Sequence, residues 1–317
     1  MNNNLPLAMP KSKRGFVYIL QHYWQLYVLM IVPVVYILIF QYYPITGLQL
    51  AFKKFDYALG MWGSPWNGLD NFKKFFSNYM FSRIIINTVR ISILNVLVTF
   101  PFPILFALAL NSVNHSNFKK TAQTLTYIPH FISVVVMVGI MRQFLHPRIG
   151  VYGSIVYTFT GDYPKDPFLI PTAFDPLYVL SSVWQTFGYE SIMFLAALTS
   201  INPELYEAAE IDGTTRFQRV MHVEIPSILP TIIIMLILRV GTLIGIGFEK
   251  VYLMQTAMNL QTSEVISTYI YKQSIGGGAL ANYGYATAIS LFNNVINFIL
   301  LVSVNAISRR VSETSLW

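Results

Sequence analysis

Cysteine is absent from the 317 residues of this chain. That absence excludes disulfides, thiolate catalysis and metal sites built on cysteine ligands. Three catalytic signatures are missing as well, namely the G-x-x-x-x-G-K-[ST] phosphate loop, the H-E-x-x-H metal motif and the G-x-S-x-G nucleophile elbow. The histidines are scattered along the sequence, at His22, His115, His130, His146 and His222. We therefore expect no catalytic residues, no metal site and no ATP hydrolysis by this chain.

Charged residues are also scarce. They make up 11% of the chain, whereas 54% of the residues are hydrophobic and the mean hydropathy is +0.52. This composition is typical of a membrane protein. The net charge of +7 is explained by lysine and arginine at the ends of membrane spans, near anionic headgroups, and needs no nucleic-acid partner. The basic N-terminus precedes an apolar run without a clear small-residue cleavage site, so we predict an uncleaved first span.

Long apolar runs predict an all-α polytopic fold, because a helix needs roughly 20 apolar residues to cross the bilayer core. Six spans are predicted, at about 26–45, 84–110, 124–145, 176–200, 228–250 and 284–307. Residues 1–25 form a separate N-terminal segment, in which 15–25 are expected to form an interfacial helix. Residues 26–317 form the transmembrane domain. Six spans place both termini on one side, and the lysine and arginine distribution only weakly favours that side as cytoplasmic.

A polar stretch from Ile201 to Pro230 separates two apolar runs and has clear helix-capping signals. Asn202 is expected as an N-cap, with Pro203 as the first helical residue. Gly213 is expected to end that helix in the left-handed conformation. Thr214 or Thr215 can then cap a second short helix, predicted to run to Pro226. Two helices joined in this way form a compact elbow outside the bilayer, where another protein can hold it.

The elbow resembles the EAA loop of ABC importer permeases, in particular the carbohydrate type. The resemblance rests on Glu207-Ala208-Ala209, Asp212-Gly213 and Ile225-Pro226, at the spacing of that loop. It extends over about 84–308 through the stretches Phe248–Met254 and Tyr283–Ala288, and more loosely to the first span, where the likeness is to permeases for complex oligosaccharides. Two features depart from the pattern. Thr214 replaces a usual alanine, and the usual Gly-Gly-Pro after the fifth span is absent.

The resemblance implies a role and a set of partners. In this family, residues 201–227 would be the coupling loop that docks into a cytoplasmic ATPase. That ATPase would bind ATP and magnesium, and this chain itself would hold no cofactor. Further implied partners are a second homologous permease chain, two ATPase subunits, an extracytoplasmic solute-binding protein and a sugar. The implied location is the bacterial plasma membrane. The residues expected to couple to the ATPase are Glu207, Ala208, Ala209, Asp212, Gly213, Arg216 and Pro226.

Polar residues inside the predicted spans are expected to face protein or a water-filled path, because they are costly in hydrocarbon. Trp184, Gln185, Tyr189 and Glu190 in the fourth span combine aromatic faces with hydrogen-bonding groups, as a sugar ring requires. Asn87 and Asn294 complete the predicted substrate path. The alternative for Glu190 is a structural ion pair that ties two helices together, with Arg239 or Arg142.

Three other functions remain possible from the sequence. The nearest is an ABC importer for a non-sugar solute, such as an amino acid or phosphate. The second is a secondary transporter, which commonly has a repeated half that this chain does not show. The third is a membrane-embedded enzyme, which the missing catalytic motifs disfavour. The sequence does not name the sugar, its length or its charge.

Overall fold

The computed structural model describes residues 16–241 and 247–311. Regular structure within these ranges is helical, apart from one isolated bridge between Lys53 and Trp66. The predicted all-α class is therefore confirmed. Three parts of the predicted organisation lie outside the described residues, namely 1–15 of the N-terminal segment, 242–246 of the fifth span and 312–317 at the end of the predicted transmembrane domain.

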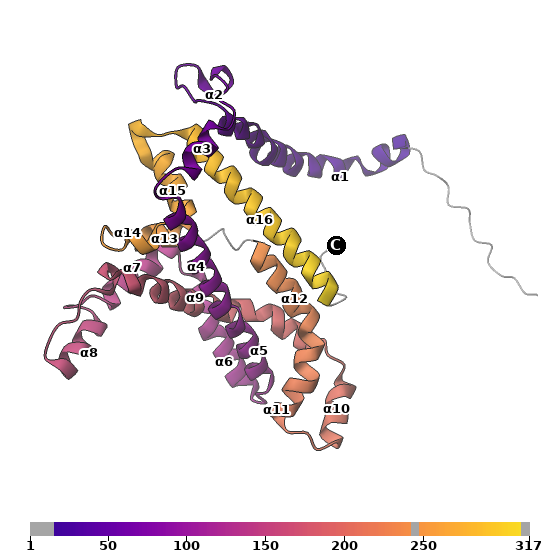
Figure 1. Ribbon diagram of the computed structural model, residues 1–317. Helices are drawn as coiled ribbons and strands as arrows, with labels where there is room; N and C mark the ends of the chain where they lie inside the picture. Colours follow the sequence, from indigo (N-terminus) through magenta and orange to yellow (C-terminus); the bar gives the residue numbers. More distant parts are fainter. Residues whose placement is uncertain (1–15, 242–246, 312–317) are drawn as a thin grey trace, which may run out of the picture.

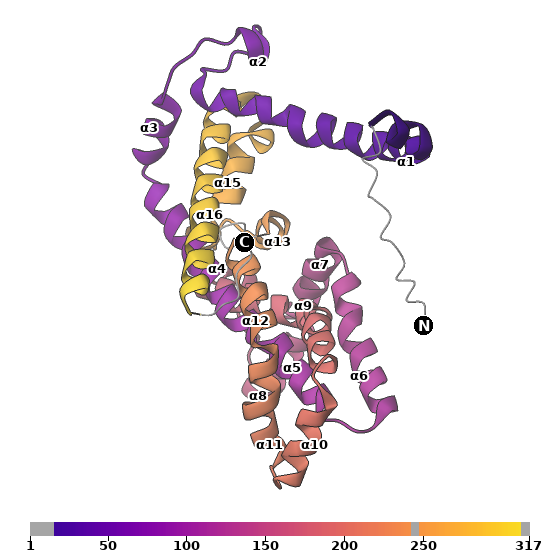
Figure 2. The same cartoon turned by 90° about the vertical axis from the view of Figure 1, so that its right-hand side faces the viewer.

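The first span is the helix α1 (Phe16–Ile37), which continues through a π turn (Leu38–Tyr42) into a 3-10 helix (Tyr43–Phe52). Tyr23 has non-helical backbone angles (φ −117°, ψ 21°), so a kink separates the predicted interfacial part from the apolar part. From His22 to Phe52 this stretch is long and apolar enough to cross a membrane, and its apolar side chains are exposed as far as Ile45. Helix α1 projects away from the other helices in both ribbon views (Figures 1 and 2), whereas the 3-10 helix packs against the C-terminal helix Tyr283–Val311. The short helices α2 (Gly60–Gly63) and α3 (Asp70–Phe76) follow.

The second span consists of α4 (Phe81–Thr99) and α5 (Pro101–Asn111). Pro101 occupies the first position of α5, where a missing N–H is tolerated. The predicted third span is bent. Its parts are α6 (Ser116–Tyr127) with a 3-10 turn (Ile128–Phe131), and α7 (Val134–Phe144), and these meet at 101°. Pro129 cannot donate a main-chain hydrogen bond, and Ser133 restarts the helix by accepting the Val136 N–H through its hydroxyl.

The predicted fourth span is the continuous helix α9 (Phe174–Thr199), which lies at the centre of the fold. Before it come α8 (Val151–Thr160) and two 3-10 turns (Pro167–Leu169 and Pro171–Ala173). Helix α9 packs against α4, α5 and α6. It is less apolar than the helices that qualify as spans by hydropathy. On the sides where α9 packs against protein it can carry polar residues such as Gln185 and Glu190, which would be costly against lipid.

After α9 the chain forms the elbow helices α10 (Pro203–Ile211) and α11 (Arg216–Arg219), a π turn (Val220–Glu224) and α12 (Ile225–Gly241). The C-terminal part contains α13 (Phe248–Met254), α14 (Leu260–Ser263), α15 (Ile266–Gln273), a 3-10 turn (Ile275–Leu280) and α16 (Tyr283–Val311). Four helices in the described ranges qualify as membrane spans, and the bent α6–α7 pair makes a fifth. The predicted count of six spans is therefore not confirmed, because α9 does not qualify on hydropathy.

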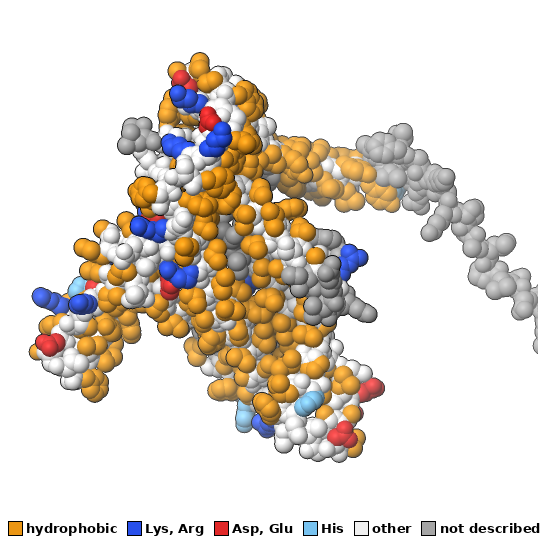
Figure 3. All heavy atoms as spheres, viewed as in Figure 1, with side chains coloured by type: hydrophobic (Ala, Val, Ile, Leu, Met, Phe, Trp, Pro, Cys, Tyr) orange, Lys and Arg blue, Asp and Glu red, His pale blue; other side chains and the backbone are white. Residues whose placement is uncertain are grey.

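The outer faces of the spans are rich in exposed apolar side chains, as Figure 3 shows over the central part of the molecule. Such apolar faces are suited to the bilayer core, which offers no hydrogen-bond partners to polar groups. Inside, one apolar cluster joins α5, α9 and the start of α12 through Ala107, Leu108, Phe194, Leu198 and Ile228. This cluster lies directly beside the elbow, so packing of three spans supports the elbow's base.

Candidate functional site: a capped elbow between two spans

The first half of the elbow is α10, and both of its ends are satisfied locally. The Glu204 N–H donates to the side-chain oxygen of Asn202 at 3.1 Å, with Pro203 at the first helical position. At the other end Gly213 has φ +69°, which favours glycine. The Gly213 N–H donates to the Glu210 carbonyl (3.0 Å), and the Thr214 N–H donates to the Ala209 carbonyl (3.1 Å). These two bonds form a Schellman motif, so the end of α10 is fixed by hydrogen bonds as well as by glycine.

The second half of the elbow begins at Thr215. Its hydroxyl accepts the Gln218 N–H, and the Gln218 side chain accepts the Thr215 N–H at 2.8 Å, which makes a capping box. Thr214 instead donates its hydroxyl to the Ala209 carbonyl (2.7 Å) and so belongs to the end of α10.

The predicted stop of the second helix at Pro226 is wrong. Helical structure continues from Arg216 to Gly241, so the elbow leads into the fifth span without a break. The Ile225 N–H donates to the Val220 carbonyl, five residues back, in the π turn that precedes Pro226. A π turn changes the hydrogen-bond register. Pro226, the second residue of α12, follows this turn and does not end the helix.

The outer surface of the elbow combines apolar and charged side chains. Ile211 is 86% exposed and Phe217 is 73% exposed, both near the turn at Gly213. Among the residues predicted to couple to the ATPase, all are exposed except Ala209, which packs inward. An exposed apolar patch rimmed by polar residues is typical of a protein–protein or membrane interaction site. The elbow also stands at one end of the molecule, with α2 at the opposite end (Figures 1 and 2).

A buried polar cluster lies behind the elbow, and the sequence did not predict it. Glu224 is fully buried, and its Oε1 lies 3.4 Å from the Arg219 Nε. The same oxygen accepts a hydrogen bond from the Asn111 Nδ2 at 3.1 Å, and this amide also donates to the Tyr206 hydroxyl at 3.3 Å. The Arg219 guanidinium lies over the Tyr206 ring, 5.4 Å from its centre. The cluster therefore joins α5, α10, α11 and the π turn.

The Tyr206 hydroxyl shows the electrostatic character of this cluster. Burial raises its pKa above the ordinary value, and the negative charge of Glu224 raises it further. The Asn111 hydrogen bond and the Arg219 charge act in the opposite direction. Tyr206 therefore stays protonated at neutral pH and keeps its hydroxyl as a hydrogen-bonding group.

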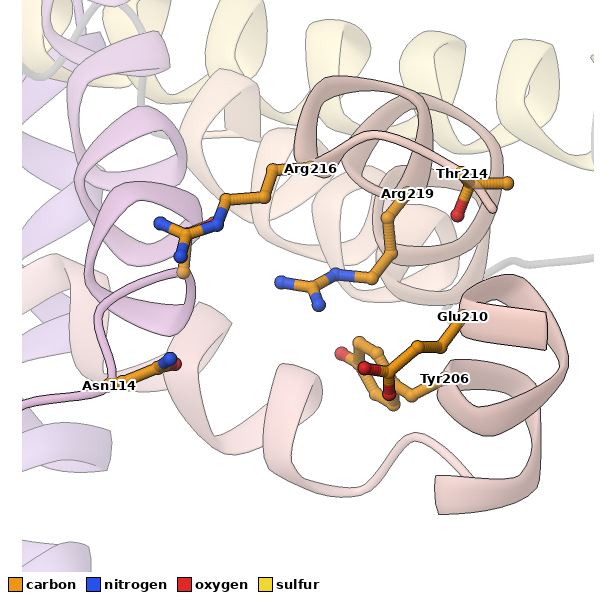
Figure 4. Close-up of a pocket in the computed structure, with 7 residues that line it drawn as sticks. Asn114, Tyr206, Glu210, Thr214, Arg216 and Arg219 are labelled. Atoms are coloured by element: carbon orange, nitrogen blue, oxygen red, sulfur yellow. The ribbon is translucent and has the colours of Figure 1, made fainter. Parts of the chain in front are cut away.

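A polar cavity of about 250 Å³ opens between the two elbow helices and the end of α5. Arg216 and Arg219 extend into it from α11, and Tyr206 and Glu210 face them from α10 (Figure 4). The remaining lining comes from Thr214 and from Ser112 and Asn114, which follow α5. Arg216 makes no ion pair or side-chain hydrogen bond within the described chain, so its charge is available to a partner.

The predicted substrate-path residues of α9 divide between its surface and its packed side. Trp184 is half exposed. Tyr189 stacks on His130 with ring centres 3.8 Å apart and an angle of 1° between the ring planes. Gln185 is buried and donates to the Ile132 carbonyl at 3.0 Å.

Glu190 makes an ion pair with Arg239 of α12 at 2.5 Å, and the same arginine donates to the Thr99 hydroxyl. This is the helix–helix pair that the sequence left open as the alternative. Arg142, the other candidate partner, donates to the Leu253 carbonyl instead.

The two remaining predicted path residues lie apart from this set. Asn87 is buried in α4, and its amide donates to the carbonyls of Gln261 and Glu264 at 3.1 and 3.0 Å. Asn294 lies exposed on α16. The path therefore stays a prediction, and the fold does not gather all six residues around one cavity. Residues 16–241 and 247–311 contain no group of acidic or histidine side chains arranged to hold a metal.

Comparison with known proteins now identifies the family. Residues 13–313 match the model of the binding-protein-dependent transport system inner membrane component. The chain belongs to this family. Its members are inner-membrane transport components, so the permease is a multi-pass subunit of the bacterial cell membrane and not an enzyme.

Similar proteins cover nearly the whole permease. It is 40% identical to Protein LplB of Bacillus subtilis (strain 168) over 293 residues, which span 92% of this chain and 91% of that protein. It is 35% identical over 308 residues to the polygalacturonan/rhamnogalacturonan transport system permease protein YteP of the same organism, spanning 97% and 94%. A crystal structure of a bacterial alginate ABC transporter in complex with alginate pentasaccharide-bound periplasmic protein matches with TM-score 0.85 and 37% identity, covering 94% and 98%.

Proposed function

We propose that this permease forms half of the translocation path of an ATP-driven importer of oligosaccharides. The substrate class is supported by the similar proteins, whose names specify polygalacturonan or rhamnogalacturonan transport and alginate binding. The expected assembly contains a second permease chain, two cytoplasmic ATPase subunits and an extracytoplasmic solute-binding protein that delivers the sugar.

The observation that carries the proposal is the capped elbow. Its two helices are fixed by the Schellman motif at Gly213 and the capping box at Thr215, and its exposed tip carries Glu207, Ile211 and Phe217. A rigid, exposed elbow can transmit movement of a bound partner to the membrane spans, whereas an elbow with frayed helix ends would not transmit it. ATP-driven closure of the ATPases would then favour one state of the spans through this contact.

The proposed contact with sugar is the exposed aromatic face of α9. Trp184 offers a flat apolar surface for the C–H face of a sugar ring. Lys73 and Lys74 are exposed in α3, and Lys54 is exposed shortly before α2. Helices α2 and α3 lie at the opposite end of the molecule from the elbow (Figure 1). The charge of these lysines favours an acidic oligosaccharide, such as one built from uronic acids.

Reconstitution in proteoliposomes tests the proposal. The permease is assembled with its partner permease and ATPases, and uptake of a labelled uronic-acid oligosaccharide is compared with uptake of a neutral one of equal length. We expect uptake that requires both ATP and the binding protein. Uptake driven by an ion gradient without ATP would instead indicate a secondary transporter. ATP-dependent uptake of an amino acid or phosphate, with none of either saccharide, would indicate the non-sugar alternative.

A further inference from the structure

The elbow has direct chain connections to α9 and α12, but none to α5. Asn111, at the end of α5, is 95 residues from Tyr206 and 113 residues from Glu224 in the sequence. Any movement of the elbow can therefore reach α5 only through side-chain contacts. The apolar cluster of Ala107, Leu108 and Ile228 supplies part of this contact. The hydrophobic contribution to this packing is non-directional.

Glu224 supplies a directional contact at this junction. Its side chain is fully buried, yet it carries a carboxylate. A buried carboxylate is costly unless it is paired and hydrogen-bonded, so Glu224 constrains its neighbours to stay within reach. The neighbours that satisfy it come from two directions, with Arg219 on α11 and Asn111 on α5. Displacement of the elbow relative to α5 by a few ångström would break one of these contacts.

The contacts are unequal in geometry. The Asn111 amide is within hydrogen-bond distance of Oε1, whereas the Arg219 Nε approaches the same oxygen at 3.4 Å without a well-aligned hydrogen bond. Oε2 has no protein partner among the described residues. The carboxylate therefore depends strongly on Asn111, and Asn111 in turn contacts Tyr206 of α10. The Asn111 amide on α5 therefore contacts both the Glu224 carboxylate and Tyr206 of α10.

We propose that Glu224 is a positioning residue for transport, which locks the elbow to α5 so that α5, α10 and α12 move as one body. This inference rests on the proposed function, because it assigns the contact through which the ATPase movement reaches the second span. Glu224 acts through Asn111 and Arg219 and touches neither sugar nor nucleotide. Without the lock, the ATPases can still close on the elbow, but the movement reaches α5 incompletely.

The test compares Glu224→Gln and Asn111→Ala with the unmodified permease in the assembled, reconstituted transporter. The measured quantity is the amount of sugar transported per ATP hydrolysed. We expect both variants to lower this ratio about fivefold or more, the lower limit of typical coupling between sites. Complex assembly and ATPase activity without substrate should persist. A residue with only a structural role would lower the yield of complex and leave the ratio unchanged.

Asn117→Ala is the matched control, because Asn117 is an exposed asparagine six residues further along whose side chain makes no bond in the described chain. It should leave the ratio unchanged. Should Glu224→Gln fail to assemble, Asn111→Ala decides, because it keeps the Arg219–Glu224 ion pair. A normal ratio in the assembled Asn111→Ala variant would overturn the inference. Absence of ATP-driven uptake by the unmodified permease would instead refute the proposed function, so the two failures are distinguishable.

Discussion

Substitution of Gly213 tests whether the shape of the elbow matters for coupling. Its φ of +69° is in the left-handed region, and a Cβ built there would meet no heavy atom within 4 Å. The cost of a side chain is therefore backbone strain without steric overlap. For an L-residue this strain is roughly 1–2 kcal/mol. That free energy corresponds to about a 5- to 30-fold loss in the population of the native elbow.

The side chains can be ranked by the same reasoning. Asparagine enters the left-handed region more readily than alanine, and a β-branched valine is disfavoured most. We expect Gly213→Asn to retain most transport, Gly213→Ala to lose part of it and Gly213→Val to lose nearly all. The Schellman bonds from Gly213 and Thr214 would be weakened in the same order.

The assay measures sugar uptake and sugar-stimulated ATPase activity of each assembled variant, with membrane insertion checked by the amount of folded permease. We expect insertion to be normal, because the strained residue lies in an exposed turn. Intact sugar-stimulated ATPase activity in assembled Gly213→Val would refute the reasoning, as would equal activity of the asparagine and valine variants.

Three further substitutions test the elbow surface, the helix packing and the proposed path. Glu207→Lys reverses an exposed charge on the elbow and should uncouple uptake from ATP hydrolysis; unchanged uptake per ATP would show that Glu207 does not contact the ATPase. Gly188→Ala should reduce the yield and thermal stability of folded permease, because the added Cβ would lie 2.2 Å from the Thr126 carbonyl oxygen. Gly139→Ala is the control and should fold normally, because a Cβ at Gly139 meets no atom within 4 Å. Equal thermal stability of the two variants would contradict the described packing of Gly188 against Thr126. Trp184→Ala should raise the sugar concentration needed for half-maximal uptake about fivefold or more, as stacking contributes roughly 1 kcal/mol; an unchanged value would remove Trp184 from the path.

Local signals in the sequence predicted much of the elbow. Asn202, Pro203 and Gly213 occupy the expected capping positions, because caps depend on hydrogen bonds to residues only a few positions away. The continuation through Pro226 was missed, because a π turn changes the register of main-chain hydrogen bonds without a residue signature. The bend in the third span was missed because hydropathy records how apolar a segment is but carries no information on its direction.

Long-range polar contacts were the least predictable part. Glu224 was visible as an acid next to an apolar run, but its partner Asn111 lies 113 residues earlier. Nothing in either local pattern connects them. For Glu190 the sequence offered two arginines, and only the packing of α9 against α12 selects Arg239. The fourth span was predicted at about 176–200 and corresponds to α9 (Phe174–Thr199), although its polar residues keep α9 from qualifying as a span on hydropathy.

The central claim is that the elbow lies in the cytoplasm against an ATPase, and the missing cysteines allow a direct test. Ile211→Cys introduces a unique thiol at an 86% exposed position on the tip. A membrane-impermeant thiol reagent is applied to intact cells, to inverted membrane vesicles stripped of ATPase, and to the same vesicles after the ATPase is restored. We expect no labelling in intact cells, strong labelling in the stripped vesicles and protection when the ATPase is bound. Labelling from outside intact cells, or no protection by the ATPase, would contradict it.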